Sequence, residues 1–181
     1  MTAFIVKRWP ALLSAVVIGT LTAGCTGGDK GSGQAGEPKG PSAAGTKYVL
    51  ASEPAGAKPV KAVRSDAKDG DAVVIVGHIG GDKKPWVEGR ASFWIVDPSI
   101  KPCPPDEGCP TPWDCCCEPK ETLRQAMATI KFVDEQGQTV AVDARELLGL
   151  KESQMVVVQG KAKRDDQGNL TVLAEGVFVR R

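Results

Sequence analysis

Short runs of β-branched and apolar residues, separated by Gly-, Asp- and Asn-containing turns, recur through the chain from residue 72 onward. Runs of this length, bounded by turn-forming residues, are typical of β-strands. No long amphipathic helix interrupts them, which argues against a helical bundle. We therefore expect a mainly β fold. The predicted strands are 72–81, 91–97, 126–133, 139–142, 155–163 and 170–179.

Two helical segments accompany these strands. Residues 59–67 predict one or two helical turns. Residues 143–149 predict a short helix, because Asp143 can cap its start and Gly149 can close its end. A small helix between the third and fourth strands is typical of an OB-type barrel, so we expect a single OB-like barrel of five to six strands with one short helix. Either 91–97 or 126–133 could be the second barrel strand; we prefer 126–133, with 91–97 as an added strand beside it, because the hairpin and the capped helix then follow in OB order.

Several segments carry a resemblance to known families. The pattern of 60–79, 132–137 and 156–160 resembles the bacterial OB-fold (BOF) family of exported proteins and the wider tRNA-anti-like OB group. A closer resemblance is to uncharacterised bacterial lipoproteins with a Cys- and Pro-rich insert; its segments are 68–71, 77–81, 96–98 and 109–114. The resemblance implies fold and export but no established activity. His78 stands where that pattern has Arg, and Cys115 where it has Tyr.

The first 25 residues have the features of an export signal. Lys7 and Arg8 precede a moderately apolar run at 11–23. About 20 apolar residues are needed to span a bilayer, so this run is too short for a lasting anchor and fits a signal peptide instead. The run ends at Cys25 in a sequence that resembles a bacterial lipobox. This resemblance implies cleavage before Cys25, lipidation of its thiol, and a protein anchored through lipid to a bacterial membrane. The alternative is a secretory signal with an ordinary cleavage site.

Composition divides the rest of the chain into three parts. After the predicted signal peptide (1–24), residues 25–57 are rich in Gly and Pro, which predicts a flexible tether that begins at the lipidated Cys25. Residues 58–181 form the expected barrel domain, with a Cys- and Pro-rich insert at 98–121. The insert contains seven of the 13 prolines and five of the six cysteines, so it cannot form a helix or a central strand.

The cysteines of the insert allow three interpretations. Structural disulfides are favoured, because an exported protein meets oxidising conditions. The expected participants are Cys103, Cys109, Cys116 and Cys117, with Cys115 left over; crossed bridges from 116 and 117 to 103 and 109 would fit, although the sequence does not fix the pairing. Zinc or copper binding is the second interpretation. The cysteine spacing differs from that of common zinc knuckles, so our leading prediction includes no metal or other cofactor. A thiol–disulfide catalyst is the third, and the surrounding acidic residues disfavour it.

Charge and motif content narrow the functional classes. Residues 58–181 carry 18 basic and 19 acidic side chains, a net charge of −1, which disfavours nucleic acid as a partner. No pair of carboxylates indicates acid–base catalysis, so we do not expect an enzyme. The leading hypothesis is a membrane-tethered binding or interaction domain at the cell envelope, with an envelope protein or a small ligand as its partner. The candidate binding surface contains Trp94, Trp113, Lys163 and Arg164.

Overall fold

The computed structural model describes residues 40–104 and 108–181. The predicted signal peptide and the predicted lipidation site Cys25 lie outside the described residues. Among the helices of the described part, none has the length and apolar character needed to cross a membrane.

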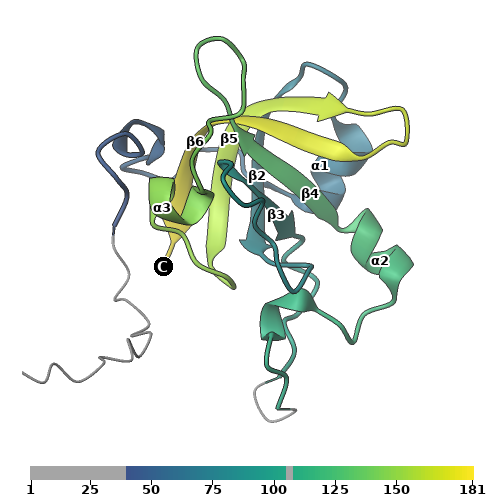
Figure 1. Cartoon of the computed structure of the whole chain (residues 1–181). Coiled ribbons are helices and arrows are strands. Elements are labelled where there is room, and N and C mark those ends of the chain that lie inside the picture. Colours follow the sequence, from purple (N-terminus) through teal and green to yellow (C-terminus); the bar gives the residue numbers. More distant parts are fainter. Residues whose placement is uncertain (1–39, 105–107) are drawn as a thin grey trace, which may run out of the picture. The chain divides into compact units, whose positions relative to one another are not determined.

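Five strands form a closed barrel (Figure 1). They are β2 (Ala72–Ile79), β3 (Ser92–Val96), β4 (Met127–Phe132), β5 (Met155–Arg164) and β6 (Leu170–Arg180). The order around the barrel is β2-β3-β4-β6-β5, and β5 pairs with β2 to close it. All pairings in the barrel are antiparallel except the parallel pair β4–β6. A short helix, α3 (Ala144–Leu148), lies in the chain between β4 and β5. The prediction of a mainly β, OB-like barrel is confirmed.

The predicted assignment of the second strand is wrong. β3 pairs with β2 through Ile79 and Ile95 on one side, and with β4 through Trp94 and Thr129 on the other. Residues 92–96 are therefore the second barrel strand and 127–132 the third. The run 139–142 contributes only an isolated bridge, from Thr139 to Val133. The additional strand is β1 (Lys58–Pro59), which runs parallel to β2. A short turn between two strands indicates that they pair. β3 and β4 do pair, but the long insert lies between them in the chain, so the sequence does not show that they are neighbours.

Local sequence determines where the helices begin and end. α1 (Val60–Asp66) follows Pro59, whose fixed φ suits a helix start, and it confirms the helical turns expected there. In α3 the Asp143 carboxylate accepts a hydrogen bond from the Arg145 amide, and Gly149 closes the helix at φ 66°. Between α1 and α3 in the chain, the helix α2 (Lys120–Gln125) connects the insert to β4.

The folded unit extends N-terminally beyond residue 58, the expected start of the domain. A 3-10 helix, η1 (Thr46–Tyr48), packs Tyr48 into the core, and the Tyr48 hydroxyl donates to the Val133 carbonyl oxygen at 3.2 Å. The Leu50 amide donates to the Val177 carbonyl oxygen on β6. Part of the segment that composition assigned to the tether thus contacts the barrel.

The core follows from strand alternation. One register row across four strands points inward and consists of Phe93, Ile130, Val172 and Ala162, each at most 2% exposed. Phe93 stacks on Phe132 with ring centroids 6.3 Å apart, and the Tyr48 ring meets Phe132 edge-on. Buried aromatic and branched side chains of this kind supply most of the hydrophobic stabilisation of a small barrel. The adjacent row points outward and forms part of a candidate binding surface.

Candidate functional site: a cysteine cluster and an outer groove

The insert begins with a turn held by the buried carboxylate of Asp97. Its oxygens accept hydrogen bonds from the Lys61 amide at 2.8 Å and the Ser99 amide at 2.9 Å. The chain then returns along itself, because the Cys103 amide donates to the Pro112 carbonyl oxygen at 2.9 Å. The Gly81 amide, just after β2, donates to the Trp113 carbonyl oxygen at 2.8 Å. These contacts fix both sides of the insert against the end of the barrel.

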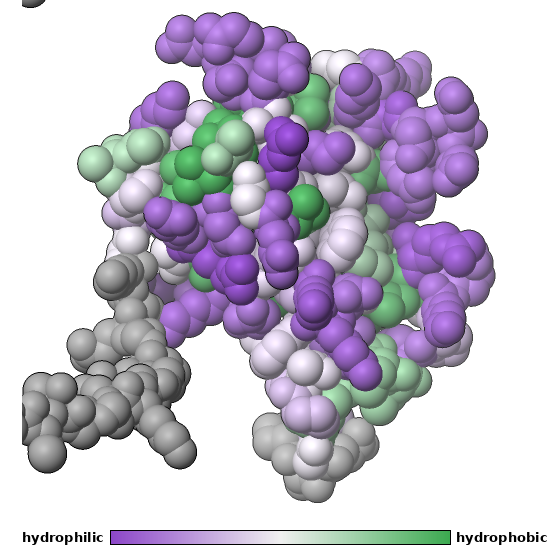
Figure 2. Space-filling view, in the orientation of Figure 1, coloured by the Kyte–Doolittle hydropathy of each residue, from purple (hydrophilic) through white to green (hydrophobic). Residues whose placement is uncertain are grey.

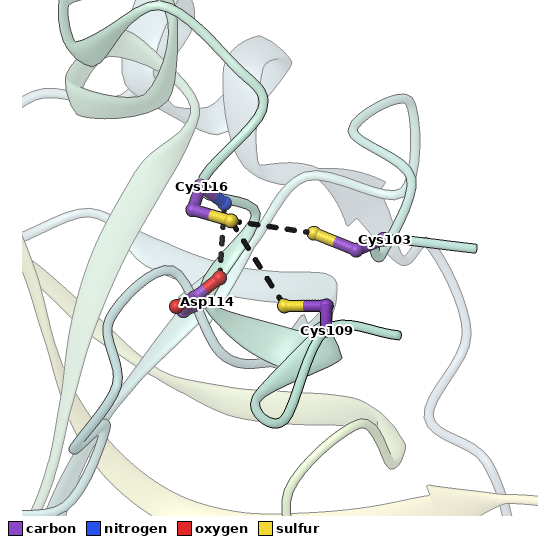
Figure 3. Close-up of side chains that lie close together, drawn as sticks. All are labelled: Cys103, Cys109, Asp114 and Cys116. Atoms are coloured by element: carbon purple, nitrogen blue, oxygen red, sulfur yellow. Dashed lines mark hydrogen bonds between the residues drawn. The ribbon is translucent and has the colours of Figure 1, made fainter. Parts of the chain in front are cut away.

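Four cysteine sulfurs of the insert lie close together. The Cys103 Sγ is 3.7 Å from that of Cys116, and the Cys109 and Cys116 sulfurs are 4.0 Å apart (Figure 3). The Cys103 Sγ is also 3.8 Å from that of Cys117. These are the four cysteines that the sequence singled out. A disulfide requires about 2.05 Å between its sulfurs, so within the described residues no disulfide joins them. The predicted covalent bridges are thus absent from the structure, although their predicted members converge.

A carboxylate completes this cluster. Asp114 is 5% exposed; one oxygen accepts from the Thr111 hydroxyl at 2.8 Å, and the other accepts from the Cys116 amide at 3.0 Å. The ligand atoms of Cys103, Cys109, Asp114 and Cys116 all lie within 4.8 Å of one another. The cluster could therefore hold a metal ion. In the sequence, Asp114 is only one of several acidic residues around the cysteines. A Thr three residues before an Asp in a Pro-rich turn is the sequence pattern that could have indicated the fixed orientation of the Asp114 carboxylate.

Cys115 has a different environment from the clustered cysteines. It has a φ of 53°, is 1% exposed, and packs with Val96, Ile100 and Ala126. Its sulfur is 3.9 Å from the His78 Nε2 atom. Burial raises the pKa of the Cys115 thiol to about 11, which keeps it protonated at neutral pH. This side chain is thus part of the packing between insert and barrel.

The clustered thiols differ in how readily they ionise. Cys116 has a raised pKa, chiefly because its thiol hydrogen-bonds with Cys103 and with Asp114. Partial desolvation opposes ionisation of Cys103, but hydrogen bonds from Cys116 and Cys117 outweigh it and lower the Cys103 pKa. The neighbouring thiols therefore stabilise a negative charge on the Cys103 sulfur by donating hydrogen bonds to it.

A second candidate site lies on the outer face of the barrel. One register row crosses four strands through Trp94, Thr129, Thr171 and Lys163, and points away from the core. A groove of about 380 Å³ runs beside this row and is lined by Arg64, Arg124 and Lys131, among others. Hydrophilic side chains also cover most of the face shown in Figure 2, where hydrophobic residues form small separate patches.

The structure brings together some of the predicted surface residues and separates others. Trp94 and Lys163 lie in the same outer row. Arg164 is a structural residue instead, because its guanidinium donates to the Ala67 and Arg64 carbonyl oxygens and joins β5 to α1. Trp113 belongs to the insert, where its indole N–H donates to the Lys83 carbonyl oxygen.

The groove cations Arg64, Arg124 and Lys131 were not predicted from the sequence, because they come from separate segments of the chain. Lys131 follows strand alternation, so a correct strand order would have placed it on the outer face.

No protein-family model matches the chain, and no curated protein sequence matches it. The two sites are therefore interpreted from their own chemistry.

Proposed function

We propose that this protein is a non-enzymatic binding domain, exported and lipid-anchored through Cys25, that binds a small acidic saccharide in the groove beside Trp94. The observation that carries the proposal is the placement of three cationic side chains and one indole on the same outer face of the barrel. A positively charged groove attracts anionic ligands, and an exposed aromatic face stacks on flat or ring-shaped groups.

The cations of the groove are only partly neutralised by nearby acids. Arg64 is oriented by the carbonyl oxygens of Met127 at 3.0 Å and Gly168 at 3.3 Å, which leaves its charge in place. Arg124 forms an exposed ion pair with Glu121, and such a pair is worth little in water. Asp165 also lines the groove, and its charge offsets part of that of Arg64; its carboxylate accepts three hydrogen bonds within its own turn, from residues 167 and 169.

Trp94 supplies the apolar part of the surface. Its half-buried indole lines the groove and also an adjoining hollow that contains Lys120 and Leu123. Pyranose rings present flat C–H faces to indoles, and acidic substituents on those rings would face the cations. The net charge of −1 over residues 58–181 disfavours long polyanions, so a short acidic saccharide fits better than nucleic acid.

A lipid anchor at the cell envelope would place the domain near such ligands. The support for it is the order of features at the N-terminus: Lys7 and Arg8, the apolar run 11–23, and Cys25 in a lipobox-like context. Metabolic labelling with a radioactive fatty acid tests this part. Label should enter the wild-type protein and not the Cys25→Ser variant; equal labelling of both would contradict the anchor.

Calorimetric titration of the purified full-length protein with a sulfated hexasaccharide tests the groove. Trp94→Ala and Lys131→Gln should each weaken binding. We expect about a tenfold loss for Trp94→Ala, at the lower end of the range of about 1–3 kcal/mol that one aromatic side chain contributes by stacking on a nucleobase. Lys151→Gln is the matched control, since it removes an exposed positive charge away from the groove. An undiminished affinity in both groove variants, or no binding by the wild type, would refute the proposal.

A further inference from the structure

We infer that Cys103, Cys109 and Cys116, together with the carboxylate of Asp114, form a tetrahedral binding site for one Zn²⁺ ion. The site is separate from the groove and does not depend on the proposed saccharide ligand. The site uses only side chains of the insert. The sulfurs of Cys103, Cys109 and Cys116 converge there without belonging to the barrel core.

The distances between the sulfurs match a tetrahedral metal–thiolate site. A Zn–S bond is about 2.3 Å, and the edge of a regular tetrahedron is about 1.6 times its centre-to-corner distance, so two thiolates on one zinc are separated by about 3.8 Å. The Cys103–Cys116 and Cys109–Cys116 distances are 3.7 and 4.0 Å. A disulfide would require either pair to approach by almost 2 Å. Two of the three sulfur–sulfur separations are thus already close to those that a shared ion needs, and all four ligand atoms lie within 4.8 Å of one another.

Asp114 is positioned to be the fourth ligand. Its carboxylate is buried, and one of its oxygens lies within 4.8 Å of all three sulfurs. The Thr111 hydroxyl and the Cys116 amide hold the carboxylate in this orientation. Hydrogen bonds that orient a ligating group in this way are a regular feature of metal sites, and each carboxylate oxygen retains a lone pair for the ion.

The backbone of the insert prepares the site. The hydrogen bond from the Cys103 amide to Pro112 sets the first ligand opposite the short 3-10 helix η3 (Pro112–Asp114). Cys115 then adopts a left-handed conformation, which reverses the chain and directs the Cys116 side chain toward Cys103 and Cys109. Cys103 is buried, whereas Cys116 is exposed, so an ion can reach the cluster from solvent.

The donor set selects the class of ion. Three thiolates favour thiophilic cations such as Zn²⁺ and Cu⁺ over Ca²⁺ and Mg²⁺, which prefer sites made of oxygen ligands. A fourth, oxygen ligand in a tetrahedral arrangement favours Zn²⁺ over Cu⁺. The spacing of the cysteines along the chain does not indicate a zinc site. The ligands come from one loop that folds back on itself and not from two Cys-x-x-Cys turns.

The experiment is a metal titration of the full-length protein, reduced and stripped with a chelator. Co²⁺ is the spectroscopic probe, because its absorption reports both thiolate ligation and tetrahedral geometry, and Zn²⁺ is then added to displace it. We expect one Co²⁺ per chain, with charge-transfer and ligand-field bands that Zn²⁺ abolishes. The variants Cys103→Ser, Cys109→Ser and Cys116→Ser should each weaken Zn²⁺ binding by at least tenfold.

Cys115→Ser is the matched control. It removes a neighbouring thiol that contacts His78 and not the ligand group, so Zn²⁺ affinity should be retained. Asp114→Asn and Cys117→Ser test the fourth ligand: the first should change the Co²⁺ spectrum and the second should not. Circular dichroism establishes that each variant is folded, and Cys→Ala versions replace any that are not.

Three results would overturn the inference. The first is failure of the reduced wild-type protein to bind Zn²⁺ or Co²⁺. The second is an equal loss of binding in the Cys115→Ser control, which would show that the cluster has no specific role. A spectrum that Cys117→Ser changes and Asp114→Asn does not would overturn the assignment of Asp114.

Discussion

The barrel and the cysteine insert are held in their conformations by different kinds of interaction. β5 and β6 pair over most of their length, and the interior is filled by side chains such as Phe93 and Phe132 that are fully buried. The described part of the insert contains no strand; a few backbone hydrogen bonds and the carboxylates of Asp97 and Asp114 fix its path. Most of the buried apolar contacts therefore lie in the barrel, whereas the clustered thiols lie in a loop outside it.

The largest expected effect is in the barrel core. Phe132→Ala should lower the free energy of unfolding by about 3–5 kcal/mol, because it removes a ring packed between Tyr48 and Phe93 and leaves a cavity. Urea denaturation of the metal-free protein measures this loss. Lys101→Ala, at an exposed position of the insert, should change stability by less than about 0.5 kcal/mol. Similar losses in the two variants would contradict the division between barrel and insert.

A smaller effect is expected where two barrel strands approach closely. A Cβ atom at Gly160 would lie 2.2 Å from the Leu173 carbonyl oxygen, next to a register shift in the β5–β6 pair. Gly160→Ala should therefore destabilise the protein by about 1–3 kcal/mol in the same denaturation assay. Gly40→Ala is the control, because nothing lies within 4 Å of its would-be Cβ atom. An unchanged midpoint for Gly160→Ala would show that the strands can separate without cost.

Neighbouring cysteines should differ in their contribution to stability. In metal-free protein, Cys115→Ala should cost about 1 kcal/mol, because its sulfur fills a buried contact with Val96 and Ala126. Cys116→Ala removes an exposed side chain and should leave the free energy of unfolding, measured by urea denaturation, within about 0.5 kcal/mol of wild type. If Cys116→Ala were the more damaging substitution without metal, the insert would have a structural role that its contacts do not indicate.

The smallest effect is a pH dependence that comes from His78. Burial lowers the pKa of this histidine in the folded state from its ordinary value of 6.5, and the charge of Asp97 only partly opposes the shift. The unfolded chain then binds the proton at higher pH, so stability is complete above that ordinary value and declines as the pH falls below it. We expect the loss of stability between about pH 7 and about pH 5 to be smaller in His78→Gln. An identical pH profile for both proteins would contradict this assignment.

The sequence predicted most elements of the fold, because strand runs, turn residues and helix caps act locally. The caps at Asp143 and Gly149 were identified by residue type alone, and so was the helix after Pro59. The strand order was less predictable. Which runs become neighbours depends on barrel closure, and the insert removed the short connection that would have joined 92–96 to 127–132.

The two candidate sites were predictable to different degrees. The sequence identified the converging cysteines, but spacing along the chain contains no information on sulfur–sulfur distances, so it could not separate disulfides from a metal site. Asp114 was missed as a ligand candidate because its orientation depends on Thr111 and on a backbone amide. The groove was predicted only in part, since Arg64 and Arg124 reach it from helices far apart in sequence.

X-ray absorption at the zinc edge tests the central claim most directly. Full-length protein loaded with one equivalent of Zn²⁺ should show three sulfur neighbours at about 2.3 Å and one oxygen neighbour at about 2.0–2.2 Å. The same measurement on Cys116→Ser should show fewer sulfur neighbours. A spectrum of the wild-type protein with only oxygen or nitrogen neighbours would contradict the account, because it would mean that the converging sulfurs do not bind the ion.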